Sequence, residues 1–236
     1  MVLAARDEAA LGAATDQCLE AGAASGGRAA PVALDVTAAD AGTRLVETAE
    51  RAFGRLDVLV NNAGTSSTRP LEDLTDHEWQ AQWELNVMAP LRLMQAAAPV
   101  MARAGGGRIV NVTSAAGKRP GLNNAAYSVT KTAQLSLSRV FADAWAERGV
   151  QVNAVAPGPV ATPLWTGEGG LADQYAEAAG GTREDALEAM AARVPVGRLG
   201  TAEEITSVIL LLCSTRSSFV TGAAWSVDGG YVPLFI

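Results

Sequence analysis

"RIVNVTS", residues 108–114, is a short apolar run of the length of one buried strand. A helical pattern follows over residues 125–148, and a second apolar run, "VQVNAVAPG", occupies residues 150–158. Apolar strands joined by a crossover helix are typical of parallel sheets that are covered on both faces. This strand-helix-strand unit decides the fold class, because the rest of the chain repeats it.

The same alternation extends over the whole chain. Strands are predicted at residues 2–5, 31–36, 56–62, 108–114, 150–158 and 223–230. Helices are predicted near 7–24, 39–53, 76–103, 125–148, 171–193 and 201–215, two of them starting with the capping boxes "TDHE" (75–78) and "TAEE" (201–204). The sequence therefore predicts an α/β fold with a doubly wound, Rossmann-like parallel sheet in one domain over residues 1–236.

Composition excludes several classes of function. The 236 residues are 49% hydrophobic and carry a formal net charge of −7, which argues against a nucleic-acid partner. No apolar run is long enough to span a bilayer and no leader pattern is present, so we expect no membrane partner and a cytoplasmic location. Cys18 and Cys213 are far apart and predict free thiols rather than a disulfide or a metal site.

Chemistry concentrates in "AAYSVTK", residues 125–131. Tyr127 and Lys131 are four residues apart and so share one face of the predicted helix. A lysine ammonium beside a phenol favours the phenolate, which lowers the pKa of Tyr127 and makes it usable as an acid or base. An isolated pair of this kind is more often a solvated lysine beside a half-buried tyrosine, so further residues must support the functional interpretation.

Those residues are present. Ser114 ends a predicted strand thirteen positions before Tyr127, "NNAG" (61–64) ends another, and Asn86 lies in the helix between them. "PG" (157–158) and "VDGG" (227–230) lie at the ends of the next two predicted strands. In this order the motifs resemble those of the classical short-chain dehydrogenase/reductase family, and the resemblance covers residues 1 to about 230.

The resemblance implies a catalytic role for four residues. Tyr127 passes a proton to the substrate oxygen as hydride arrives from the nicotinamide, and Ser114 hydrogen-bonds that oxygen. Lys131 lowers the tyrosine pKa and holds the nicotinamide ribose, while Asn86 anchors a water of the proton relay. The physical logic agrees, since a developing alkoxide needs donors placed in advance and a proton source of matched acidity.

Other positions resemble the family's cofactor contacts. Arg6 follows the first predicted strand, where the adenosine ribose binds, and its planar guanidinium suits a 2′-phosphate, so NADP(H) is favoured over NAD(H). Asp35 resembles the acid that contacts adenine, and Thr162 the residue that contacts the nicotinamide carboxamide. The resemblance thus implies cofactor contacts at Arg6, Asp35, Asn62, Ala63, Gly64, Tyr127, Lys131, Pro157, Gly158 and Thr162.

One part of the family pattern is not found. Members carry a first strand, a glycine-rich turn and a helix that hold the pyrophosphate, whereas residues 1–11, "MVLAARDEAAL", match the end of the second strand. About 30 residues are thus expected before Met1. A native protein that starts upstream, a truncation with a rearranged sheet, or a partner segment could explain this, and we favour the first. Cofactor binding by the chain as printed is expected to be impaired.

Two classes of function remain. The first is an NADP(H)-dependent oxidoreductase that interconverts a small-molecule carbonyl and a secondary alcohol, with Tyr127 as acid/base. The alternative is a non-redox binding protein or cofactor-free lyase on the same scaffold. Apolar residues on more than one stripe of the helix 125–148, and the terminal segment "VDGGYVPLFI" (227–236), predict a homodimer or homotetramer.

Overall fold

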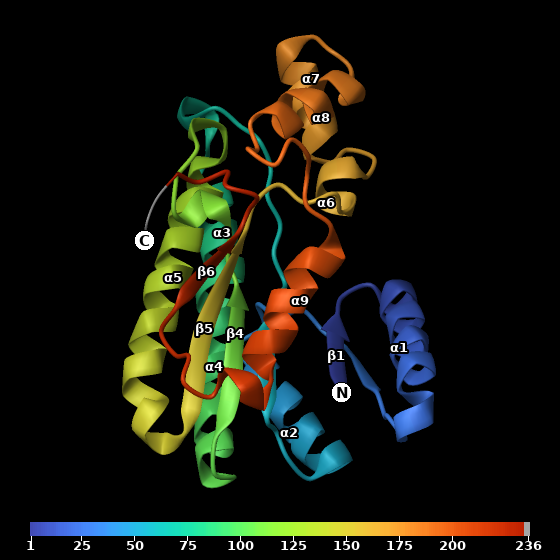
Figure 1. The fold of residues 1–236 in the computed structure, drawn as a ribbon, viewed down its shortest axis with the longest axis vertical. Helices are drawn as coiled ribbons and strands as arrows, with labels where there is room; N and C mark the ends of the chain where they lie inside the picture. Colours follow the sequence, from blue (N-terminus) through green and yellow to red (C-terminus); the bar gives the residue numbers. More distant parts are fainter. Residues whose placement is uncertain (234–236) are drawn as a thin grey trace.

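Two parallel sheets form the framework of the computed structural model, which describes residues 1–233. The smaller pairs β1 (Val2–Ala5) with β2 (Ala30–Ala33). The larger has the order β3-β4-β5-β6, from β3 (Val58–Asn61), β4 (Gly107–Val112), β5 (Val150–Pro157) and β6 (Ala224–Val227). The predicted α/β fold with parallel strands is confirmed, with strands mostly shorter than the predicted runs (Figure 1).

Helices cover both faces of the larger sheet. On one face, α2 (Ala41–Phe53), α4 (Ala89–Arg103) and α5 (Ala125–Trp145) share an apolar cluster with β4 and β5. On the other face, α9 (Ala202–Cys213) packs on the same two strands, while α1 (Glu8–Gly22) packs on the smaller sheet. Figure 1 shows β4 and β5 between α5 and α9, with β1 and α1 to one side.

The alternation of side chains along β4 explains this two-sided burial. Ile109 points into the cluster with α4 and α5, and its neighbour Val110 into the cluster with α9. Both side chains are fully buried, because successive residues of a strand face opposite sides of the sheet. A buried central strand of this kind is apolar on both faces, which is why "RIVNV" reads as a continuous apolar run.

The helix predicted over 76–103 is interrupted by a π-helical turn. It consists of α3 (Asp76–Trp83), the turn η3 (Glu84–Met88) and α4. The capping box predicted for α3, between Thr75 and Glu78, is present. A π turn accommodates one additional residue within a helix, and such turns are frequent at functional sites.

The prediction of one helix over 171–193 is wrong. The segment forms α7 (Leu171–Ala179) and α8 (Arg183–Ala192), which are separated at Gly180, where φ is +69°. A second capping box, between Thr182 and Asp185, starts α8. With the short α6 (Pro163–Thr166), these helices project beyond the carboxyl ends of the strands (Figure 1). They form a cover over that edge of the sheet.

Short turns connect the remaining elements. They are η1 (Ala23–Ser25), η2 (Leu71–Asp73), η4 (Ala115–Gly117), η5 (Leu122–Asn124), η6 (Ala146–Arg148) and η7 (Thr215–Ser217). The capping box predicted for α9, between Thr201 and Glu204, is present.

Over residues 1–233 no helix is long and apolar enough to cross a membrane. Both cysteines are free, as predicted, and the last three residues of the terminal segment 227–236 lie outside the described part.

Within the described chain, the two sheets are not hydrogen-bonded to each other. β1 pairs only with β2, and β3 pairs only with β4. Among residues 1–233 the inner edges of β1 and β3 are thus without a ladder partner.

Candidate active site

The carboxyl ends of the strands bring the predicted catalytic residues together. Ser114 lies two residues after the end of β4, and its Oγ accepts a hydrogen bond of 3.1 Å from the backbone N–H of Ala116. Tyr127 and Lys131 lie in the first two turns of α5, which begins beside the same edge. Parallel strands present their carboxyl ends on one side, where open α/β sheets bind ligands.

The side chains of Tyr127 and Ser114 form a hydrogen-bonded pair. The pKa of Tyr127 is raised because the phenol is buried, and a hydrogen bond with Ser114 opposes that rise. The phenol is therefore protonated at neutral pH and can donate a proton. The lower pKa that the sequence predicted for Tyr127 is wrong for the protein alone, because burial of the phenol outweighs every favourable contact.

Lys131 is held by two acceptors. Its Nζ donates to the Val112 carbonyl and to Gln134 Oε1, each at 3.0 Å, and lies 5.6 Å from the centre of the Tyr127 ring. The side chain is 2% exposed. Burial lowers the pKa of Lys131 to about 7. Its Nζ lies over the face of the ring, within the distance of a cation–π contact.

Asn86 occupies the centre of the π turn and is fully buried. Its Nδ2 donates to Gln82 Oε1 at 2.7 Å and to Thr130 Oγ1 at 3.1 Å, whereas Oδ1 has no partner. A methyl group at Gly64 would lie 3.6 Å from this oxygen and 3.5 Å from Lys131 Nζ. A buried acceptor and a buried donor thus face the same small space, which suits a water or a ligand hydroxyl.

The residues predicted to bind the adenosine lie together on the smaller sheet. Arg6 follows β1 and Asp35 follows β2, and their charged groups are 3.9 Å apart on the surface. Hydrogen bonds from Thr37 lower the pKa of Asp35, with a smaller contribution from Arg6. Both side chains are exposed and so accessible to a ligand.

The other predicted cofactor contacts, among them the NNAG motif expected beside the adenine half, lie on the larger sheet. Asn62, Ala63 and Gly64 follow β3 and are exposed. Pro157 ends β5, and Gly158 packs so closely that a methyl group there would lie 2.8 Å from Asp228 Cα. Thr162 precedes α6. The unpaired Asn86 oxygen, the space at Gly64 and these exposed backbone segments fit a nicotinamide nucleotide bound across the strand ends.

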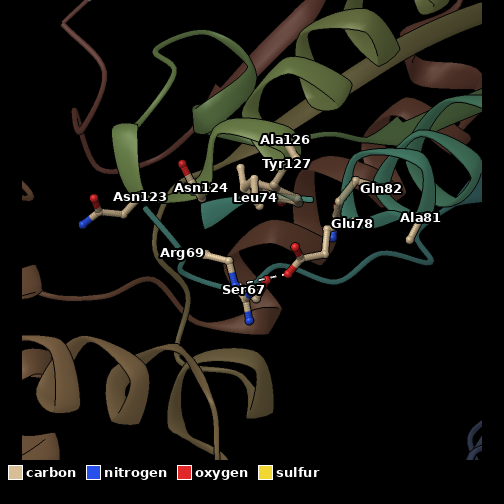
Figure 2. Close-up of a pocket in the computed structure, with 10 residues that line it drawn as sticks. All are labelled: Ser67, Arg69, Leu74, Glu78, Ala81, Gln82, Asn123, Asn124, Ala126 and Tyr127. Atoms are coloured by element: carbon tan, nitrogen blue, oxygen red, sulfur yellow. Dashed lines mark ion pairs between the residues drawn. The ribbon is translucent and has the colours of Figure 1, made fainter. Parts of the chain in front are cut away.

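A pocket opens beside Tyr127 (Figure 2). It has a volume of about 100 Å³ and is lined by Ser67, Arg69, Leu74, Glu78, Ala81, Gln82, Asn123, Asn124, Ala126 and Tyr127. Arg69 Nε and Glu78 Oε1 form an ion pair at 3.1 Å across it, as the dashed line in Figure 2 marks. Seven of the ten lining residues have polar side chains, so the pocket offers hydrogen-bond donors and acceptors to a ligand.

The cover of α6, α7 and α8 is tied to the loop that carries this pocket. Gln174 Oε1 of α7 accepts hydrogen bonds from Thr68, at 2.8 Å from its backbone N–H and 3.0 Å from Oγ1. Trp165 of α6 stacks on Tyr175 of α7 with ring centres 5.7 Å apart. The cover is therefore attached to the site on one side and braced internally.

Sequence reasoning missed two kinds of residue. Gln134 was not predicted, although it lies seven positions after Tyr127 and three after Lys131, spacings that place all three on one helix face. Arg69 and Gln82 were missed because their contacts depend on a loop and on the π turn, which no local pattern predicts.

Comparison with known proteins identifies the family of this chain. Residues 2–232 match the family model described as enoyl-(acyl carrier protein) reductase. The short-chain reductase protein NovJ of Streptomyces niveus is 39% identical over 207 residues, which are 87% of this chain and 76% of that protein. The 3-oxoacyl-[acyl-carrier-protein] reductase FabG of Thermotoga maritima is 36% identical over 208 residues, 87% of this chain and 78% of that protein.

A solved structure is also similar. L-sorbose reductase of Gluconobacter frateurii, complexed with NADPH and L-sorbose, superimposes with a TM-score of 0.90 at 33% identity. The match covers 99% of this chain and 87% of that chain.

Proposed function

We propose which residues of this chain carry out its reaction and which cofactor and substrate it takes. The chain belongs to the short-chain dehydrogenase/reductase family and is an oxidoreductase that exchanges hydride between a nicotinamide cofactor and a carbonyl or alcohol. Tyr127 is the acid/base, Ser114 binds the substrate oxygen, and Lys131 and Asn86 complete the site. The observation that carries the assignment is the hydrogen-bonded, half-buried pair Tyr127 and Ser114 beside the ammonium of Lys131.

In the reductive direction, Tyr127 donates its phenolic proton to the carbonyl oxygen as negative charge develops there. The bound nicotinamide supplies the hydride. Ser114 donates a second hydrogen bond to that oxygen and fixes its position. Burial, which keeps the phenol protonated, prepares Tyr127 as the proton donor of this step.

Lys131 and Asn86 act on either side of the space at Gly64. The remaining N–H of Lys131 binds a ribose hydroxyl, which brings positive charge to the Tyr127 side of the site. The unpaired Oδ1 of Asn86 accepts a hydrogen bond from a water that returns the proton to Tyr127.

NADP(H) is the proposed cofactor. Arg6 exchanges its exposed contact with Asp35 for the 2′-phosphate, because a guanidinium binds a phosphate in a bidentate manner. Asp35 contacts the adenine, Asn62, Ala63 and Gly64 pass close to the nucleotide, and Thr162, with the turn at Pro157 and Gly158, holds the carboxamide. The NADPH in the similar L-sorbose reductase supports this choice. Impaired binding stays a prediction, which titration of the 236-residue chain with NADPH tests.

The proposed substrate is a small polar carbonyl compound. The ion pair of Arg69 and Glu78, with the side chains of Ser67, Gln82 and Asn123, offers donors and acceptors beside Tyr127. The alternative of a binding protein or lyase is not favoured, because the similar proteins are named as reductases and dehydrogenases.

A homodimer or homotetramer is proposed as the assembly. Val129 and Val140 of α5 are exposed, and a second copy would cover them. Light scattering at micromolar concentration tests this, and a monomeric mass would contradict it. A cytoplasmic location stays a prediction.

The test of the function is a cofactor and substrate screen. The purified chain is incubated with NADPH or NADH and a panel of ketoses, keto acids and simple ketones, and the alcohol product is identified by mass spectrometry. We expect faster oxidation of NADPH than of NADH and a matching amount of alcohol. Absence of turnover over the whole panel, with each cofactor at a concentration that titration shows to be saturating, would overturn the proposal.

A further inference from the structure

Lys131 receives a contact that its catalytic role does not require. Gln134 lies one helical turn further along α5, is 1% exposed, and places its carboxamide oxygen 3.0 Å from Lys131 Nζ. An ammonium only donates, so the carboxamide must present its oxygen here. The second acceptor is the Val112 carbonyl of β4, also at 3.0 Å. Two of the three N–H groups of the ammonium are thus hydrogen-bonded, and the directions of these two bonds fix the direction of the third N–H.

A buried chain of hydrogen bonds fixes the helix that carries Gln134. Ser138 Oγ donates to the Gln134 carbonyl at 2.7 Å and accepts from Asn111 Nδ2 at 2.8 Å. Asn111 Oδ1 accepts in turn from Asn61 Nδ2 at 2.7 Å, across the pairing of β3 and β4. The side chain of Gln134 is therefore held on a helix turn that is bonded to the sheet.

We propose that Gln134 is a positioning residue for the reaction: it holds the Lys131 ammonium against β4, so that the third N–H faces the space at Gly64. This assignment rests on the proposed function of Lys131. The geometry supports it, because Lys131 Nζ has no third hydrogen-bond partner in residues 1–233 and the unpaired Asn86 oxygen faces the same space.

Gln134 also sets the charge of Lys131. Around the ammonium lie the Val112 carbonyl from β4, Gln134 and the Tyr127 ring from α5, and Asn86 and Gly64 from the neighbouring segments. Tyr127 is the titratable group among them, and no charged side chain contributes to the lowered pKa of Lys131. The Gln134 oxygen consequently favours the charged form in a site where burial opposes it.

Direct titration of Lys131 tests the proposal. The chain has two lysines, so selective ¹³C labelling gives two side-chain signals in an NMR titration, and Lys118→Arg identifies the signal of Lys131. Gln134→Met keeps the length of the side chain and removes the acceptor, so we expect the pKa of Lys131 to fall by about one to two pH units. Gln134→Glu places a carboxylate there and should raise it.

The same variants are then assayed. We expect the pH profile of kcat to move down in Gln134→Met and up in Gln134→Glu, in step with the titrations. An unchanged pKa of Lys131 in both variants would overturn the proposal, as would a pKa that moves while the pH profile stays in place.

The two variants and the titration distinguish failure of this proposal from a folding defect and from failure of the proposed function. If Gln134→Met does not fold, as judged by circular dichroism, the nearly isosteric Gln134→Glu still decides the direction. The titration needs no substrate, so it tests the contact even if the wild type reduced nothing, a result that would overturn the proposed function instead.

Discussion

The strands β1 and β2 have the same parallel pairing as β4 and β5 but very different surroundings. In β4 and β5 the side chains of Ile109, Val110, Val150, Val152 and Val155 are all 0% exposed. None of the residues of β1 or β2 is buried. A parallel strand becomes part of a core only when it has neighbours on both edges and helices on both faces. β3 is intermediate, since it pairs on one edge only and leaves Val60 39% exposed.

This difference separates the two halves of the site. The proposed catalytic residues Ser114, Tyr127 and Lys131 lie at the end of β4 and on α5, which packs on the larger sheet. Arg6 and Asp35 follow the two strands of the smaller, thinly covered sheet. The chemistry should therefore be insensitive to changes in β1 and β2, and recognition of the cofactor should be sensitive to them.

Tyr127→Phe is expected to have the largest effect. Loss of the phenolic proton donor should lower kcat by about 10³-fold, with little change in the melting temperature, because one hydroxyl is removed and the ring stays packed. Steady-state kinetics and thermal unfolding check this. Retention of near wild-type kcat would show that the acid/base lies elsewhere.

Two cavity-creating substitutions, one in each sheet, compare how much buried side chains of the two sheets contribute to stability. Ile109→Ala in β4 should lower the free energy of unfolding by about 2–5 kcal/mol, because a fully buried side chain is removed. Leu3→Ala in β1 should lower it by about 1–2 kcal/mol, because this side chain is half-buried. Equal losses in urea denaturation would mean that β1 is packed as tightly in solution as β4.

Lys131 provides a pH test of the buried site. Its pKa of about 7 lies below its ordinary value of 10.5, so the unfolded chain binds more protons between these pH values. The free energy of unfolding of the wild type, relative to Lys131→Met, should therefore rise from pH 7 to pH 10, by on the order of 3–4 kcal/mol. A flat difference would show that Lys131 is solvated.

Arg6→Ala is expected to have the smallest effect. Loss of a charge-assisted contact on the thin sheet should reduce the preference for NADPH over NADH by about 10-fold in kcat/KM. The kcat with saturating NADPH should stay the same. A variant with unchanged preference would remove Arg6 from the 2′-phosphate site.

The sequence predicted the parts of this site that local patterns encode. Five of its six strands overlap β1 and β3 to β6 over nearly their whole observed length, and the catalytic spacing of Ser114, Tyr127 and Lys131 needed no structure. The break at Gly180 was missed although the two adjacent glycines and the capping residues Thr182 and Asp185 were visible. Apolar residues recur at helical spacing on both sides of Gly180, so the pattern predicts one continuous helix.

Two features could not be predicted because they depend on the environment rather than on the pattern. The raised pKa of Tyr127 results from burial, which neighbouring residues in sequence do not determine. The π turn at Asn86 has i→i+5 backbone hydrogen bonds in place of the i→i+4 bonds of an α-helix. Its residues "ELNVM" have no composition that distinguishes them from those of an ordinary helix.

That π turn has a consequence for the length of the chain between its two flanking helices. Each residue of a helix turns the side chains by about 100° around the axis, so removing one residue from 84–88 would change the rotational phase of α4 relative to α3. Either Met94, Ala97 and Met101 would leave the sheet, or Asn86 would turn away from Thr130. The number of residues in this segment is therefore fixed by two helix faces that must be presented at once.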